Sequence, residues 1–81
     1  MLTELEHGSK VVGLNQSRRA ISGGRARVVF LAEDASPFII SEIEELCRKN
    51  GVELEYVPTM RQLGRACGLS VSSAVAASVK K

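Results

Sequence analysis

The side chains best suited to binding chemistry lie together in one polar stretch, Gly13-Leu14-Asn15-Gln16-Ser17-Arg18-Arg19-Ala20. Asn15 is of a residue type preferred at helix N-caps, so we expect a helix to begin there. At helical spacing Asn15, Gln16 and Arg19 face one way, while Ala20 and Ile21 turn inward. Amide and guanidinium groups beside the unpaired N–H groups of a helix N-terminus suit a polyanion, through its phosphates or its electron-rich base edges.

A plainer interpretation of the same stretch is the one that residue types alone favour. Asparagine is a common helix cap without any binding role, and a pair of arginines is commonly a solvated helix face. The residues alone therefore leave both interpretations open, and a wider pattern has to decide between them.

Three blocks of sequence supply that wider pattern, and they cover roughly residues 2 to 79. The blocks are Gly13-Leu14-Asn15-Gln16 with Arg19-Ala20-Ile21, then Leu31-Ala32-Glu33-Asp34-Ala35-Ser36-Pro37, and Leu63-Gly64-Arg65-Ala66-Cys67-Gly68-Leu69. With these blocks in this order, the chain resembles the L7Ae/L30e superfamily of ribosomal RNA-binding proteins, and within it the short bacterial homologues that bind kink-turn RNA.

The resemblance implies which residues meet the RNA. It sets Asn15, Gln16 and Arg19 against the major-groove edges of tandem sheared G·A pairs, where amides donate and accept and arginine offers a fork of donors. Gly13, Arg18 and Arg65 belong to the same expected RNA-binding set. Where relatives have Glu or Lys in this motif, Gln16 and Arg19 keep the reach, and the charge changes at Gln16.

The loop Leu69-Ser70-Val71 completes the expected site. Apolar residues between a glycine and a strand ordinarily tuck into the core, whereas in the family the matching loop packs against unstacked nucleotides at the kink. Relatives commonly carry an acidic residue at its centre, and Ser70 departs from that pattern. This departure removes the carboxylate from that position, while the apolar contacts of Leu69 and Val71 stay as the resemblance implies.

Length and composition predict one small domain spanning residues 1–81, because 44% apolar residues suffice for a core. No apolar stretch approaches the roughly 20 residues that cross a bilayer, and the first residues lack the pattern of a secretory signal. We therefore expect a cytoplasmic protein that does not engage membranes and is monomeric when free.

Charge is distributed unevenly along the chain although its net value is only +2. Residues 7–32 carry +5 and residues 56–81 carry +4, whereas residues 33–55 between them carry −5. The two basic segments, 7–32 and 56–81, contain no Asp or Glu. If folding brings them together, the protein has a basic and an acidic side, as expected for docking on nucleic acid.

No residue pattern indicates catalysis, a metal or a cofactor. Cys47 and Cys67 lack metal-site spacing and read as small buried apolar residues, and His7 has no nucleophile or ligand candidate nearby in sequence. The carboxylates Glu42, Glu44 and Glu45 read as a solvated helix face on which Glu44–Arg48 and Glu45–Lys49 can pair. We expect a non-enzyme without cofactors.

Alternating helix and strand signals predict an α/β fold, a three-layer α-β-α sandwich around a small mixed sheet of about four strands. The sharpest signals are the Ser36-Pro37 helix start, the Asn50-Gly51 stop and the Thr59 cap. The expected elements are a helix at 3–10, an edge strand at 11–12, a helix at 15–22, a central strand at 27–32, a helix at 37–50, a strand at 52–57, a helix from Thr59 to about 67 and a strand at 72–79.

The aromatic residues Phe30, Phe38 and Tyr56 all fall in elements expected to be packed, so no stacking platform for single strands is predicted. The function expected from sequence is recognition and stabilisation of kink-turn RNA, either ribosomal RNA or another non-coding or regulatory RNA. The alternative is a small protein-interaction module of the same fold that uses the acidic side and binds RNA weakly or not at all.

Overall fold

The protein, described here from a computed structural model, is defined over residues 8–80. Most of the helix predicted at 3–10, and His7, lie outside the described residues, but Lys10 begins a strand instead of ending a helix. In chain order the elements are β1 (Lys10–Val12), α2 (Leu14–Ser22), β2 (Ala26–Ala32), α3 (Pro37–Asn50), β3 (Glu53–Val57), α4 (Met60–Ala66) and β4 (Val75–Val79).

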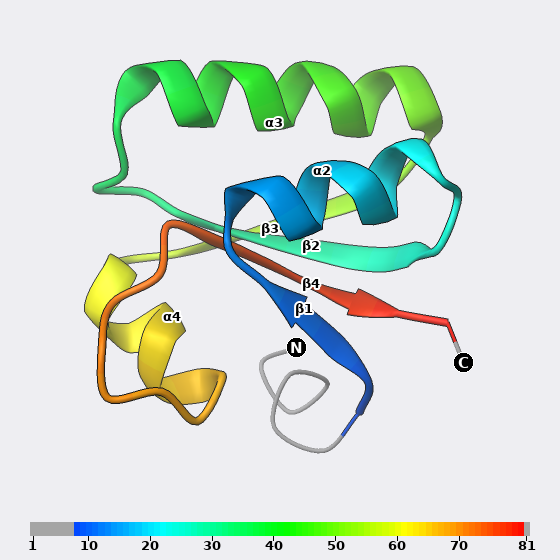
Figure 1. The fold of residues 1–81 in the computed structure, drawn as a ribbon. Coiled ribbons are helices and arrows are strands. Elements are labelled where there is room, and N and C mark those ends of the chain that lie inside the picture. Colours follow the sequence, from blue (N-terminus) through cyan, green and yellow to red (C-terminus); the bar gives the residue numbers. More distant parts are fainter. Residues whose placement is uncertain (1–7, 81) are drawn as a thin grey trace.

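The four strands form one mixed sheet in the order β1-β4-β2-β3. Strand β4 runs antiparallel to both β1 and β2, and β2 runs parallel to β3 across the α3 connection. Helices α2 and α3 cover one face of the sheet and α4 covers the other (Figure 1). The predicted α-β-α sandwich, with a four-stranded mixed sheet and a central β2, is confirmed.

Strand β2 supplies both cores by alternation, because successive side chains of a strand point to opposite faces. Val28 and Phe30 pack with Leu63 of α4, whereas Val29 and Leu31 belong to the cluster beneath α2 and α3. Both faces of β2 are covered by helices, which accounts for the almost unbroken apolar run in its sequence.

Strand β4 carries small residues because it lies between the two helical layers. Ala76 and Ala77 are fully buried on opposite faces, and Ser78 Oγ accepts a hydrogen bond from Val28 N at 3.2 Å beside an irregularity in the β2 register. The strand predicted to start at residue 72 begins only at Val75, since the Ser73 backbone N–H bonds to the Met60 carbonyl at 3.0 Å and leaves the sheet.

Helix α3 has the predicted bounds. Ser36 Oγ accepts a hydrogen bond from Phe38 N, Pro37 is the first helical residue, and Gly51 ends the helix with a φ of 65° that favours glycine. The predicted surface pairs are wrong in detail: Arg48 contacts Glu45 at 3.0 Å, and Glu44 accepts a hydrogen bond from a tyrosine hydroxyl.

The expectation that all three aromatic residues are packed is wrong for two of them. Phe30 is 1% exposed, but Phe38 is 86% exposed and Tyr56 is 48% exposed. Tyr56 lies on the edge strand β3 and donates its hydroxyl hydrogen to Glu44, which raises the Tyr56 pKa. Phe38 has no such contact, because its position around α3 points it away from the sheet.

Both cysteines are free and buried, as the sequence predicts. Cys47 lies in the cluster under α2 and α3 and Cys67 in the cluster under α4, on opposite faces of the sheet. Burial raises the pKa of Cys47 to about 11 and also raises that of Cys67, so both thiols are protonated near neutral pH. Among residues 8–80 no group of His, Cys, Asp and Glu is arranged to hold a metal ion.

Ser17 is the exception in an otherwise apolar helix–sheet contact, since it is fully buried and its hydroxyl has no hydrogen-bond partner among the described residues. Ser17→Ala removes an unpaired polar group and improves helix propensity, so we expect the free energy of unfolding to rise by about 1 kcal/mol. Urea unfolding measures the change. Ser22→Ala, at an exposed position of the same helix, reports the propensity gain alone, and a destabilised Ser17→Ala would mean that the hydroxyl is bonded.

Candidate nucleic-acid interface

Helix α2 begins earlier than the sequence predicts, and its cap is different. Gly13, with a φ of 98°, is the N-cap residue, and no side chain caps the helix. Asn15 is therefore the second helical residue, and the prediction that it caps the helix is wrong. Because a glycine makes the turn, the Asn15 amide is available for other contacts.

The Val75 carbonyl oxygen joins the two parts of the expected site. It accepts hydrogen bonds from the Gly13 backbone N–H and from the Ser73 hydroxyl, both at 2.9 Å. One bond ties the start of α2 to β4, and the other ties the connection that precedes β4 to the same point. The α2 N-terminus and the α4–β4 connection therefore meet at one end of the sheet (Figure 1).

Asn15 is oriented by its neighbour one turn along the helix. Arg18 Nη1 donates to Asn15 Oδ1 at 3.3 Å, and the Arg18 guanidinium also forms an ion pair with Glu42 of α3. The hydrogen bond with Glu42 raises the pKa of Arg18 above its already high value. Because a guanidinium only donates, this contact occupies the amide oxygen and leaves the two N–H groups of Asn15 available to donate to another partner.

Gln16 and Arg19 lie on the same exposed edge as Asn15, whereas Ala20 and Ile21 are fully buried. The inward and outward faces of this helix are therefore as predicted. Arg19 is also the one basic residue in the last turn of α2. We call the Asn15, Gln16 and Arg19 side chains the amide–arginine edge.

The connection from Gly68 to Ala74 presents apolar side chains to solvent. Leu69 is 37% exposed and Val71 is 66% exposed, so the ordinary interpretation that this loop tucks into the core is wrong. Ser70 between them is exposed as well. Backbone bonds hold the loop at both ends, from Leu69 N to the Gly64 carbonyl at 2.9 Å and from Ser73 N to the Met60 carbonyl at 3.0 Å.

Gly64 lets this loop lie directly on α4. A Cβ atom at this position would fall 2.0 Å from the Val71 carbonyl oxygen and 3.0 Å from the Ser72 Cα, both backbone atoms. The absence of a side chain at Gly64 therefore permits the close packing, and the packing partner is the loop itself.

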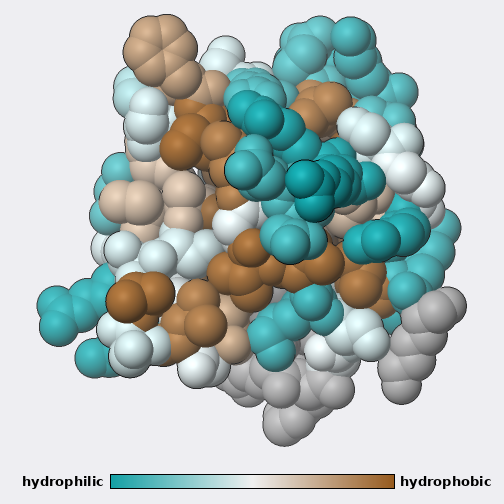
Figure 2. Space-filling model, viewed as in Figure 1, coloured by the Kyte–Doolittle hydropathy of each residue, from teal (hydrophilic) through white to brown (hydrophobic). Residues whose placement is uncertain are grey.

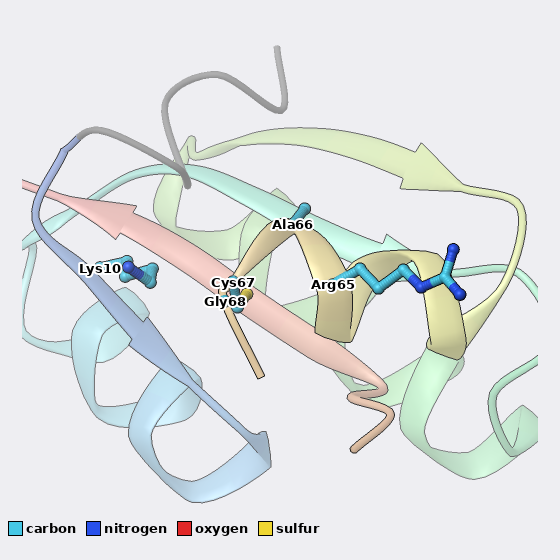
Figure 3. A pocket seen from close by; sticks show the side chains of 5 residues that line it. All are labelled: Lys10, Arg65, Ala66, Cys67 and Gly68. Carbon is cyan, nitrogen blue, oxygen red and sulfur yellow. The ribbon is translucent and has the colours of Figure 1, made fainter. Parts of the chain in front are cut away.

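Arg65 lies apart from the amide–arginine edge, on the other face of the sheet. With Lys10, Ala66, Cys67 and Gly68 it lines a hollow of about 220 Å³ between β1 and the end of α4. Figure 3 shows the Arg65 side chain extending along α4 and away from Lys10. Sequence reasoning omitted Lys10, although its place in the basic segment 7–32 was a signal.

The two basic segments meet through the pairing of β1 with β4, which is the condition under which the charge pattern predicts a basic side. Strand β3, which carries part of the acidic segment, lies at the opposite edge of the sheet. Figure 2 shows hydrophilic side chains over α2 and the adjoining part of α3, with hydrophobic surface at the end of the molecule near the α4–β4 connection. The arrangement combines hydrogen-bonding and apolar surface at one end of the fold.

A family model matches residues 2–81 of the chain, that of the ribosomal protein L7Ae/L30e/S12e/Gadd45 family. An RNA-binding protein of Caldanaerobacter subterraneus subsp. tengcongensis is 37% identical over 70 residues, covering 86% of this chain and 85% of the relative. An RNA-binding protein of Geobacillus sp. (strain WCH70) is 38% identical over 76 residues, covering 94% and 93%.

Similarity extends to an archaeal ribosomal protein and to a solved eukaryotic structure. The large ribosomal subunit protein eL8 of Halobacterium salinarum is 45% identical over 73 residues, which cover 89% of this chain but only 61% of that longer protein. The Giardia lamblia 15.5kD RNA binding protein has a TM-score of 0.90 and 30% identity, over 99% of this chain and 71% of that chain. Within residues 8–80, no helix has the length and apolar character needed to cross a membrane.

Gly64→Ala tests whether the loop depends on this glycine. We expect the new methyl group to push the Val71 carbonyl away and to lower the free energy of unfolding by about 1–3 kcal/mol, as overpacking does. Amide hydrogen exchange of Leu69 and Ser73 should accelerate, since their bonds to α4 hold the loop. The exposed Gln62→Ala in the same helix should change neither quantity, and unchanged exchange in Gly64→Ala would contradict the close approach.

Proposed function

The chain belongs to the ribosomal protein L7Ae/L30e/S12e/Gadd45 family, and we propose that it is a non-catalytic protein that binds structured RNA and stabilises a kink-turn with tandem sheared G·A pairs. The proposal includes a single RNA-binding domain that is monomeric when free and works in the cytoplasm, on ribosomal RNA or another non-coding RNA. RNA binding is the property named for the two bacterial relatives and for the Giardia protein of the same fold.

The observation that carries the proposal is the double hydrogen bond to the Val75 carbonyl. It brings a hydrogen-bonding edge and an apolar loop to one end of a rigid sheet. A regular duplex presents no matching pair of surfaces, since its bases are stacked and its edges lie in grooves. A kinked RNA presents both base edges and unstacked bases at one point.

The amide–arginine edge fits the base edges of G·A pairs by its chemistry. The outward N–H groups of Asn15 donate, Gln16 both donates and accepts, and Arg19 offers paired donors for base acceptors or phosphates. The A-form major groove is too deep and narrow for side chains to read, so these contacts require the distortion of a kink. Shape thereby becomes part of the specificity.

The remaining proposed site residues act at the borders of this edge. Gly13 gives the turn that frees Asn15, and Arg18 orients Asn15 while paired with Glu42. Leu69 and Val71 contact unstacked nucleotides with Ser70 between them, and Arg65, on the other side of the sheet, serves as a phosphate contact at the periphery. The amide–arginine edge and the loop Leu69-Ser70-Val71 are the parts that discriminate between RNA sequences.

The mechanism is a shift of population between RNA conformations. Kinked and extended forms interconvert, and a protein that binds the kinked form more tightly favours it by the difference in the two affinities. Binding to a kink-turn RNA, measured beside an unkinked duplex of equal length, tests the function. Equal affinity for both would favour general attraction, and no binding to either would favour the alternative of a protein-interaction module.

Asn15→Ala and Arg19→Ala test the edge directly. Each removes a proposed base contact and should cost on the order of 1–3 kcal/mol of affinity for kink-turn RNA, with reduced discrimination against the duplex. Matched controls are Asn50→Ala and Arg25→Ala, at exposed sites away from the N-terminus of α2, and these should bind as the parent does. Calorimetric titration gives the affinities, and full binding by folded Asn15→Ala and Arg19→Ala would remove the edge from the mechanism.

Salt dependence measures the phosphate contribution. Roughly three to five neutralised phosphates would give a slope of about −3 to −4.5 in a plot of log affinity against log KCl concentration. Arg65→Ala should reduce the magnitude of the slope by about 1. A slope near zero would exclude phosphate contacts, and one near −10 would require a much larger basic surface than the proposed site provides.

A further inference from the structure

We propose that Phe38, at the start of α3, stacks on an unpaired nucleobase of the bound RNA and adds affinity to the interface. The inference rests on the proposed function and extends the site beyond the residues that the sequence predicts. It starts from an aromatic side chain that the fold leaves 86% exposed.

The Phe38 ring has no role in holding the fold together. At about 100° per helical residue, Phe38 lies about 140° around α3 from the fully buried Ile43. It belongs to neither of the two buried clusters nor to the partly buried residues packed against them. A ring that contributes little to folding is available for a contact made on binding, and its position relative to the proposed interface decides which contact that is.

The backbone beneath the ring is fixed. Pro37 sets the first helical residue, and the Phe38 N–H donates to Ser36 Oγ at 3.3 Å. Asp34, in the turn before Ser36, accepts a hydrogen bond from the Met60 N–H at 2.8 Å and so anchors this turn to α4. The ring is therefore presented from a rigid base, which reduces the entropy lost when it binds.

A chain of contacts connects Phe38 to the amide–arginine edge. Phe38 precedes Glu42 by four residues, so the two lie one above the other on the same side of α3. Glu42 pairs with Arg18, and Arg18 donates to Asn15. Phe38 thus lies one turn from the contact that joins α3 to α2, toward the end of the molecule where α3 begins (Figure 1).

Charge at this border favours a nucleobase as the occupant. The Arg18 guanidinium neutralises Glu42, the carboxylate between Phe38 and α2, so the approach of RNA along this side meets less repulsion. Unpaired bases at a kink expose faces that stack on aromatic rings whatever their sequence. The surface is continuous with the proposed RNA interface, which makes a base of the same RNA the occupant.

The test compares Phe38→Leu with Phe38→Trp on a kink-turn RNA that retains its unpaired nucleotides. Leucine keeps apolar bulk without an aromatic face, so Phe38→Leu should lose about 5- to 150-fold in affinity, the range for one stacked base. Phe38→Trp should bind at least as tightly as the parent. Because the chain has no other tryptophan, the emission of Phe38→Trp should be quenched when RNA saturates it.

An RNA with abasic sites at the unpaired positions identifies the partner. The parent should lose affinity for it, and Phe38→Leu should show little further loss. Tyr56→Leu, the other exposed aromatic position, is the matched control and should bind as the parent does. Thermal unfolding should be unchanged in Phe38→Leu, because the ring is not packed.

Failure of this inference differs from failure of the proposed function. Parent-like binding by Phe38→Leu, or unquenched emission of Phe38→Trp at saturation, overturns the stacking role. If Arg19→Ala loses binding in the same assay, the proposed interface itself still stands. No binding of kink-turn RNA by the parent overturns both.

Discussion

The Val75 carbonyl is the point on which the arrangement of the site depends. Its two hydrogen bonds, from the Gly13 N–H and the Ser73 hydroxyl, fix the start of α2 and the exit of the α4–β4 connection against the first residue of β4. Strand β4 in turn pairs with β1 on one side and β2 on the other. Any displacement of β4 would therefore move both halves of the proposed interface, and its small buried residues allow the helical layers to hold it in place.

Elements whose signals are local could be predicted from the sequence, and those set by distant contacts could not. Helix α3 was predicted with its correct bounds because Ser36, Pro37 and Gly51 specify its ends without help from other elements. The Asn15 cap was wrong because Gly13, bonded to Val75 sixty-two residues later, makes the turn instead. The start of β4 was wrong for the same reason, since the Ser73 N–H bonds to Met60 of α4.

The proposed site shows the same division. The outward-facing residues of α2 could be predicted from the helical period. The Arg18–Glu42 ion pair could not, because it joins residues twenty-four apart in the chain and no local pattern indicates it. Phe38 was misplaced by treating it as apolar and therefore packed. The stripe of Ile39, Ile40 and Ile43 already defined the buried side of α3, and helical phase alone puts Phe38 outside it. The Gly64 contact with Val71 needed the three-dimensional structure, although the glycine itself was a signal.

The core and the proposed interface use different side chains in this small protein. Asn15, Gln16, Arg19 and Val71 are exposed, so they contribute little buried apolar area and can differ from relatives without loss of the core. Gly13 and Gly64 are different, because each serves the backbone geometry that positions the exposed residues. Gln16 and the loop residue Ser70, where the resemblance implies a charged residue in relatives, both belong to this exposed group. In the proposed interface, such departures change the RNA contacts that are available and leave unchanged the geometry that presents them, which is set by the glycines and by β4.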